Sequence, residues 1–202
     1  MIQATKHSKS GFALLISIIV VGVVVSVGLS ILELTIKQLA LATNSKDSET
    51  ALHAANAGLE CAQYWRNKEY KKFEEGDDDE VVATCFGTGS SHEEIFEKDE
   101  DIDVSDGEGS VYKYTAEFDW GAVDVDARCS LITMIVMMAD SESSDPLKID
   151  DISDYISGYD IGESKECEPG GICTLTSVQG YNKSCGEVGE FGTIQREVLL
   201  ES

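Results

Sequence analysis

The chain has 202 residues, enough for one modest globular domain with an extended element. Its 38 acidic and 15 basic residues give a formal net charge of -23 at pH 7. Such a charge repels phosphate backbones, so direct nucleic-acid binding is not expected. Every acid except Glu33 lies after residue 44, and that part of the chain carries 37 acids against 12 bases, a net charge of -25. A solvated surface is the ordinary explanation; attraction of cations or basic partners and adaptation to high salt remain alternatives.

The N-terminus combines a basic leader with an apolar segment. Residues 1–11, MIQATKHSKSG, carry Lys6, His7 and Lys9 and no acid, and residues 12–32 carry no charge at all. A helix of 21 residues covers roughly 30 Å, the hydrocarbon thickness of a bilayer. Positive charge before the span and negative charge after it predict a single-pass protein of the cytoplasmic membrane, with its N-terminus in the cytoplasm and its bulk outside.

Two ordinary kinds of segment compete with this interpretation. A secretory signal peptide has a shorter apolar core followed by a small-residue cleavage site. Here the apolar segment runs on into Glu33 and Leu34 without such a site. A plain signal anchor, by contrast, fits the apolar segment fully and stays open.

The helix is expected to continue beyond the membrane. No proline occurs before Pro146, and residues 33–66 are rich in Ala, Leu, Glu, Lys and Gln, which are good helix formers. The apolar positions Leu52, Ala55, Leu59 and Ala62 recur at helical spacing and predict one buried stripe. Residues 33–66 are therefore predicted to form the amphipathic half of one long helix.

The rest of the chain has strand patterns. Residues 67–110 form a predicted acidic connecting region that holds a short apolar run at 81–86. Alternating or continuous apolar residues then predict strands at 111–118, 123–127, 131–138, 172–181 and 193–200. The continuous run at 131–138 suits a central strand packed on the helix, and Trp120-Gly121-Ala122 predicts a hairpin. The predicted fold is α+β, a long N-terminal helix packed on an antiparallel β-sheet head at 111–202.

Six cysteines follow the apolar segment, and an even number on an exported chain indicates up to three disulfides. A zinc site would need close pairs such as CxxC, and the chain has none. Their places on the predicted elements favour three pairs: Cys61 with Cys85, Cys129 with Cys185, and Cys167 with Cys173. Six cysteines allow 15 connectivities, so this pairing is one hypothesis among them.

The sequence shows no catalytic constellation. Its three histidines are dispersed, the stretch 87–91 lacks the central serine of a nucleophile elbow, and no P-loop is present. The acidic stretch 99–108 fails the EF-hand spacing, because Asp106 stands sixth and Tyr112 twelfth when the loop starts at Asp101. We therefore expect no enzyme activity, no cofactor, no metal site and no small-molecule substrate; calcium binding by the acidic loops stays open.

The junction Lys9-Ser10-Gly11-Phe12 places glycine and then phenylalanine between the leader and the apolar segment. This resembles the type III signal of type IV pilins and type II secretion pseudopilins. The resemblance implies that prepilin peptidase cuts after Gly11, that Phe12 becomes a methylated N-terminus, and that other pilin subunits are partners. The stretch 54–60, AANAGLE, is also similar to the small-residue-rich stretch of many minor pilins, where strands approach the helix closely.

The chain departs from the family at one position. Most pilins carry glutamate at the fifth mature position, where it pairs with a neighbouring subunit's N-terminal amine, and here that position is Ile16. The resemblance therefore implies a minor pilin or pseudopilin, a non-enzymatic subunit assembled into or capping an extracellular or periplasmic filament. The alternative is a membrane-anchored extracellular binding domain that forms no filament. Adhesion, DNA uptake, motility and secretion are not distinguished by these residues.

Overall fold

A computed structural model of the chain describes residues 10–76, 81–85, 94–99, 102, 104, 106–122 and 125–202. The chain divides into two compact units between Lys46 and Asp47, and each is described by itself.

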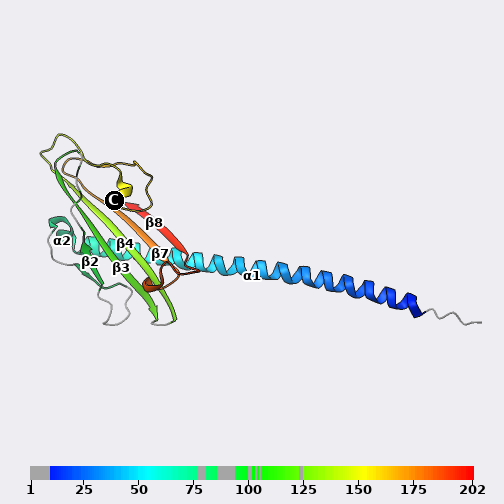
Figure 1. The fold of residues 1–202 in the computed structure, drawn as a ribbon. Helices are drawn as coiled ribbons and strands as arrows, with labels where there is room; N and C mark the ends of the chain where they lie inside the picture. The colour runs from blue at the N-terminus through cyan, green and yellow to red at the C-terminus, as the bar shows by residue number, and fades with distance from the viewer. Residues whose placement is uncertain are drawn as a thin grey trace, which may run out of the picture. The chain divides into compact units, whose positions relative to one another are not determined.

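The secondary structure consists of two α-helices, eight strands and two short 3₁₀ helices within the described residues (Figure 1). The α-helices are α1 (Ser10–Lys68) and α2 (Tyr70–Glu75). The strands are β1 (Val81–Ala83), β2 (Glu94–Lys98), β3 (Gly109–Ala122), β4 (Val125–Ala139), β5 (Leu147–Ile149), β6 (Lys165–Cys167), β7 (Ile172–Tyr181) and β8 (Gln195–Glu201). The 3₁₀ helices are η1 (Ile152–Asp154) and η2 (Cys185–Glu187).

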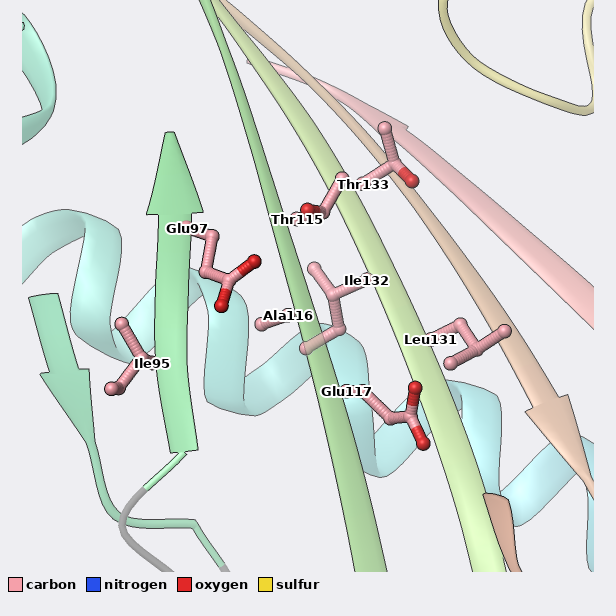
Figure 2. A pocket seen from close by; sticks show the side chains of 8 residues that line it. All are labelled: Ile95, Glu97, Thr115, Ala116, Glu117, Leu131, Ile132 and Thr133. Carbon is pink, nitrogen blue, oxygen red and sulfur yellow. The ribbon is translucent and has the colours of Figure 1, made fainter. Parts of the chain in front are cut away.

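The strands form a six-stranded sheet in the order β1-β2-β3-β4-β7-β8 and a separate two-stranded sheet of β5 and β6. Every neighbouring pair is antiparallel. The C-terminal part of α1 lies on one face of the large sheet, the inner face, while an open groove lies on the outer face (Figure 2). The predicted α+β fold, a long N-terminal helix packed on an antiparallel sheet, is confirmed.

In the first unit, α1 is apolar on all sides from Phe12 to Leu32. Its large side chains between Phe12 and Leu41 are exposed, and an 18-residue window reaches a mean hydropathy of 2.9 with none of it buried. The hydroxyls along this stretch donate to carbonyls three or four residues earlier, as those of Ser17, Ser26 and Thr35 do. Polar groups satisfied within the helix are what a hydrocarbon environment requires. Within the described residues, α1 is the one helix long and apolar enough to cross a membrane.

In the second unit, small residues bring α1 and the sheet into close contact. Ala51, Ala54 and Ala55 are fully buried. A Cβ on Gly180 of β7 would lie 2.2 Å from the carbonyl oxygen of Ala51 and 2.2 Å from the amide nitrogen of Ala55. The helix backbone therefore rests directly on a strand, at a distance that no larger side chain allows.

The same contact continues along the helix. A Cβ added to Gly58 would lie 2.7 Å from Val178 Cγ1 and 2.9 Å from Ser130 Cβ, which is too close for either neighbour. The hydroxyl of Ser130 donates a hydrogen bond of 2.8 Å to the carbonyl oxygen of Ala54. The expected close approach of strands to the small residues of 54–60 is confirmed.

The buried stripe of the helix differs from the predicted one. Of the predicted stripe, Ala55 and Ala62 are buried and Leu59 packs half-buried against the core, whereas Leu52 is 42% exposed. The buried face consists of small residues followed by one tryptophan: Ala51, Ala54, Ala55, Gly58, Ala62 and Trp65. The physical reason is the backbone contact at Gly180, which leaves room for a methyl group on the helix and not for a leucine.

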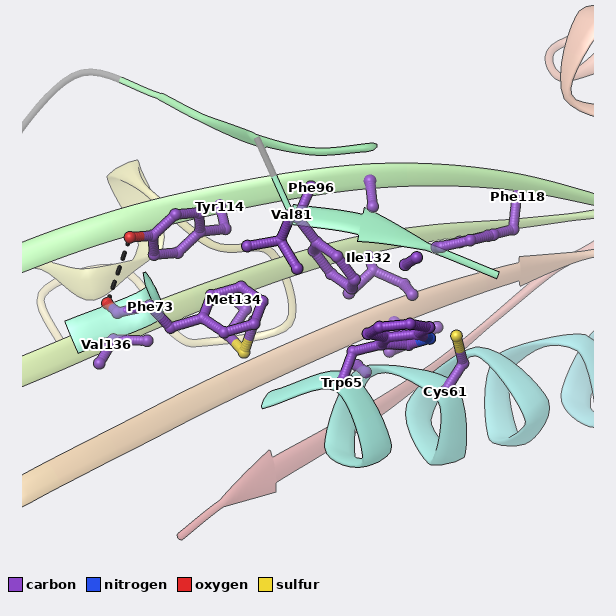
Figure 3. Packing of buried hydrophobic residues seen from close by; sticks show 14 of the residues in the cluster. Cys61, Trp65, Phe73, Val81, Phe96, Tyr114, Phe118, Ile132, Met134 and Val136 are labelled. Atoms are coloured by element: carbon purple, nitrogen blue, oxygen red, sulfur yellow. Dashed lines mark hydrogen bonds between the residues drawn. The ribbon is translucent and has the colours of Figure 1, made fainter. Parts of the chain in front are cut away.

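Strand β4 is a central strand packed on the helix, as the continuous run at 131–138 predicted, and it separates two apolar clusters. Ile132, Met134 and Val136 pack on the inner face with residues of α1, α2 and β3 (Figure 3). Ile135 and Met137 pack on the outer face under the segment that contains β5, η1 and β6. One half of the sheet is therefore covered on both faces, and the other half of its outer face stays open.

The hairpin before β4 is displaced from its predicted place. Strand β3 continues to Ala122 and β4 begins at Val125, so the predicted strands at 123–127 and 131–138 belong largely to one strand. The predicted break at Trp120-Gly121-Ala122 is a register irregularity inside the β3–β4 pair. A glycine in a strand marks a bulge as readily as a turn. Residues 123 and 124 lie outside the described residues.

The range 67–110 holds more structure than the predicted connecting region. It contains the end of α1, helix α2 and the strands β1 and β2. The sheet therefore begins before residue 111. Phe73 of α2 and Phe96 of β2 are fully buried, and their ring centroids lie 5.5 Å apart.

The helix–sheet contact predicts a large effect of one methyl group. Gly180→Ala places a Cβ against the backbone of α1, and we expect it to lower the free energy of unfolding by about 3 kcal/mol. Urea unfolding of the full chain in detergent, followed by tryptophan fluorescence, measures this change. Gly186→Ala is the matched control, because a Cβ there meets nothing within 4 Å. Equal midpoints for the two variants would contradict this packing.

Candidate functional site

The processing junction lies at the start of α1. Gly11 and Phe12 stand in its first turn, and the Phe12 side chain is 72% exposed. The remaining leader, residues 1–9, lies outside the described residues. Ile16 is 45% exposed, and the first acid after it, Glu33, is bound to Lys37 at 2.8 Å. Cleavage after Gly11 and methylation of Phe12 stay predictions.

Three disulfides hold the head together. They join Cys61 to Cys85, Cys129 to Cys185, and Cys167 to Cys173, the same pairs that the predicted elements favour. The first links α1 to the residues after β1, the second links β4 to η2, and the third closes the turn between β6 and β7. A disulfide that closes a loop like the one between Cys61 and Cys85, which are 24 residues apart, adds about 3 kcal/mol to stability.

The described residues contain one group of potential metal ligands, and a disulfide joins two of its three members. Glu117, Cys129 and Cys185 bring ligand atoms within 4.8 Å of one another. Both sulfurs are joined in a disulfide, so neither is a thiolate that binds zinc. In the acidic stretch 99–108, Asp99 binds Lys113 at 2.8 Å, while Asp101, Asp103 and Ser105 lie outside the described residues.

The pairing predicts the products of a digest under non-reducing conditions. Peptide mapping of the full chain should find Cys61 linked to Cys85, Cys129 to Cys185, and Cys167 to Cys173. Full-chain protein that is reduced before digestion is the control, because it should release all six cysteine peptides separately. A peptide that links Cys61 to any cysteine other than Cys85 would refute the arrangement of α1 over β1.

The open half of the outer face carries an acidic groove, shown in Figure 2. It has a volume of about 460 Å³ and is formed by β2, β3 and β4. Its walls are lined by Ile95, Glu97, Thr115, Glu117, Leu131 and Thr133. Both carboxylates are exposed, and neither forms an ion pair within the part of the chain that the structure describes. Lys113 of β3 is bound by Asp99 at 2.8 Å.

A second polar cluster on the outer face is satisfied internally. The hydroxyls of Ser157 and Ser177 each donate to Glu197 Oε1 at 2.6 Å, and Gln179 Nε2 donates to Ser157 at 2.6 Å. A nucleophilic serine is activated by an adjacent general base such as histidine, whereas this cluster consists of serine, glutamine and glutamate side chains. This cluster fastens the loop after η1 onto β7 and β8, and it has no arrangement suited to nucleophilic catalysis.

Lys165 joins the segment that contains β5, η1 and β6 to the C-terminal strand, β8. Its ammonium lies 2.5 Å from Glu201 and 2.9 Å from Glu163, and 4.7 Å from the centre of the Tyr159 ring. The bond from Lys165 holds the pKa of the Glu201 and Glu163 carboxyls below their ordinary value. Burial, followed by the hydrogen bond to Glu201, raises the pKa of Tyr159 to about 12.

These pKa directions predict how stability changes with pH. The depressed pKa of Glu201 and Glu163 means that their stabilisation is complete above 4.5, their ordinary pKa, and is lost as the pH falls through their folded values. The raised pKa of Tyr159 means that its stabilisation is complete below 10.0 and is lost as the pH rises toward about 12. Thermal melting of the full chain should therefore decline at both extremes.

Lys165→Met tests the acidic side of this prediction. The variant removes the ammonium that lowers both carboxyl pKa values, so the decline of the melting temperature below pH 4.5 should become shallower. Lys183→Met is the control, because Lys183 lies 3.8 Å from a single, exposed carboxylate, that of Glu190. Identical pH profiles for the two variants would show that the Lys165 cluster does not couple folding to protonation.

Comparison with known proteins supplies no relative. No protein-family model, no curated protein and no solved structure matches this chain significantly.

The structure therefore brings together some predicted residues and adds others. It joins the six cysteines in pairs and places Gly11 and Phe12 at the start of one helix. It adds the acidic groove and the Lys165 cluster, which sequence reasoning missed. The alternation of β3 already puts Thr115 and Glu117 on one face, but Glu97 joins them only because β2 pairs with β3.

Proposed function

We propose that this chain is a minor type IV pilin or pseudopilin, a non-enzymatic subunit that assembles into, or caps, an extracytoplasmic filament. The observation that carries the proposal is α1, one helix that is apolar and exposed from Phe12 to Leu32 and is packed on an antiparallel sheet from Ala51 to Trp65. A signal anchor followed by an unrelated domain does not require the anchor helix to be the core helix of that domain. A filament subunit does, because the helix connects the head to the shared apolar core.

The leader and the charge distribution support the orientation. Lys6 and Lys9 precede the apolar segment, and the net charge of -25 follows it, so the N-terminus faces the cytoplasm. Three disulfides in the head fit an oxidising compartment outside that membrane. Prepilin peptidase acts on the cytoplasmic side, where the Gly11–Phe12 bond would be presented to it.

Ile16 supports a minor rather than a major subunit. A filament buries the N-terminal amine of each subunit, and an unpaired buried charge is costly. Ile16 offers no carboxylate at the fifth mature position, and Glu33 is engaged by Lys37. A subunit at the tip, or one diluted among subunits that carry the glutamate, avoids this cost.

The second candidate is a membrane-anchored extracellular binding domain that forms no filament. Two observations favour it: the missing carboxylate at Ile16 and the acidic groove, whose exposed Glu97 and Glu117 have no ion-pair partner among the described residues. A concave acidic surface suits a cationic ligand. The two candidates differ in whether the leader is removed.

The N-terminus of the mature chain tests the proposal. Expressed with an active prepilin peptidase, the chain should begin at Phe12 and carry one additional methyl group, measured by mass spectrometry of the intact protein and of its N-terminal peptide. Gly11→Val should keep the leader, since the family resemblance places the cleaved bond after a glycine, and Ser10→Ala should leave cleavage unchanged. An intact leader on the unaltered chain, in cells that process their own pilins, would support the anchored binding domain instead.

A further inference from the structure

Basic charge is concentrated at one place on the acidic head, the junction between α1 and α2. The segment 66–72, RNKEYKK, holds four of the 12 bases that follow residue 44. Lys68, Lys71 and Tyr70 are exposed there, and Lys72 is half-exposed. We define the basic junction as Tyr64, Lys68, Tyr70, Lys71 and Lys72.

The junction has accessible lysines beside accessible aromatic rings. Tyr64 is 60% exposed and Tyr70 is 48% exposed. The Lys68 ammonium lies 4.1 Å from the centre of the Trp65 ring, which directs it along the helix surface. Exposed tyrosines are enriched at protein-binding surfaces, whose rim is polar and open to solvent.

The lysines of the junction are available, unlike the arginine beside them. Arg66 is bound to Glu74 at 3.0 Å and to the Thr174 hydroxyl at 3.3 Å. Lys68, Lys71 and Lys72 form no ion pair within the described ranges of the chain. Their charge is therefore open to a second molecule.

The acidic groove has the complementary properties. Glu97 and Glu117 stand on its walls without an ion-pair partner among the described residues, and Ile95 and Leu131, which also line the groove, supply apolar surface beside them. Lysine ammonium groups match the two carboxylates, and a tyrosine ring matches the apolar floor. The groove and the junction are thus complementary in charge and in character.

We propose that the basic junction of one copy of this chain docks into the acidic groove of a second copy. This inference rests on the proposed function, because it names the contact between heads in an assembly. The groove opens on the outer face, whereas α1 and α2 pack on the inner face, where Phe73 joins the cluster around Tyr114. The two surfaces of one copy thus face apart, and a contact between different surfaces of two copies is heterologous and repeats from copy to copy, as an open row where the rotation between copies does not close a ring.

A nucleic acid is the less favoured occupant of the basic junction. Lysines with aromatic rings do bind single strands, by charge attraction and base stacking. The surrounding head carries a net charge of -25, which repels a phosphate backbone. The acidic surface of a further copy, by contrast, attracts the basic junction. The basic junction can also contact an acidic protein surface while its exposed tyrosines keep their positions.

Cross-linking between labelled copies tests the proposal. The full chain in detergent is prepared with natural nitrogen and with ¹⁵N, and equal amounts are mixed and treated with a carbodiimide, which joins lysine directly to a contacting carboxylate. Mass spectrometry should find peptide pairs of mixed isotope that link Lys68, Lys71 or Lys72 to Glu97 or Glu117. Their yield should fall with added salt, because exposed charges are screened over about 10 Å at 0.1 M ionic strength. Pairs of a single isotope only would show that the lysines contact acids of their own chain, and would overturn the proposal.

Charge reversal supplies the second arm of the test. Lys71→Glu and Glu117→Lys should each weaken self-association in low salt by about tenfold, measured by sedimentation, since like charges then face each other. A mixture of the two variants should regain mixed-isotope cross-links between their altered residues, which now carry exchanged charges. Lys46→Glu and Glu142→Lys change the net charge equally at exposed sites outside both surfaces and should leave association unchanged.

Besides cross-links of a single isotope only, three outcomes would overturn the inference. They are undiminished association of both variants, equal weakening by the control variants, and binding of a single-stranded oligonucleotide that Lys71→Glu abolishes without any mixed-isotope cross-link. If a variant fails to fold, the cross-links of the unaltered chain still decide. Methylated Phe12 without these cross-links leaves the proposed function standing and removes the interface, whereas cross-links with an intact leader do the reverse.

Discussion

Backbone contact between α1 and β7 is the constraint on which the head depends. At Gly180 the strand lies so close to Ala51 and Ala55 that even one methyl group has no room. The hydrogen bond from Ser130 to the Ala54 carbonyl fixes the helix along the same line. Because a helix carbonyl and a strand glycine must meet there, the helix can neither rotate to bury Leu52 nor slide along the sheet. Trp65 and the Cys61–Cys85 disulfide are positioned by the same registration.

The sequence predicted the elements that lie in a uniform environment along their length. The apolar segment of α1, the doubly buried strand β4 and the strand β7 all carry long, uniform patterns. The stripe on α1 was misjudged because apolarity alone ranks leucine above alanine, while the actual contact selects for size. Strand β2 was missed because only Phe96 in it is fully buried, and the hairpin was misplaced because Gly121 lies at a strand irregularity.

The candidate sites show a similar division. The cysteine pairs agree with the hypothesis drawn from the predicted elements, although the sequence alone left 15 connectivities open. The acidic groove could not be predicted, because it exists only where β2 pairs with β3, at the register that sets Glu97 opposite Thr115. The basic stretch 66–72 is visible in the sequence, but which of its charges are available depends on the tertiary contacts of Arg66 with Glu74 and Thr174.

Charge distribution restricts how acidic heads can associate at all. Two heads of net charge -25 repel each other, and a two-fold contact centred on either surface would oppose that surface with itself, acid to acid or lysine to lysine. Only a contact between unlike surfaces brings Lys71 of one head near Glu117 of another. A row built in this way repeats one contact in one direction, which is the symmetry of a filament. Since the attraction is between exposed charges, it weakens as the ionic strength of the medium rises. Association of the apolar helix does not depend on salt in this way.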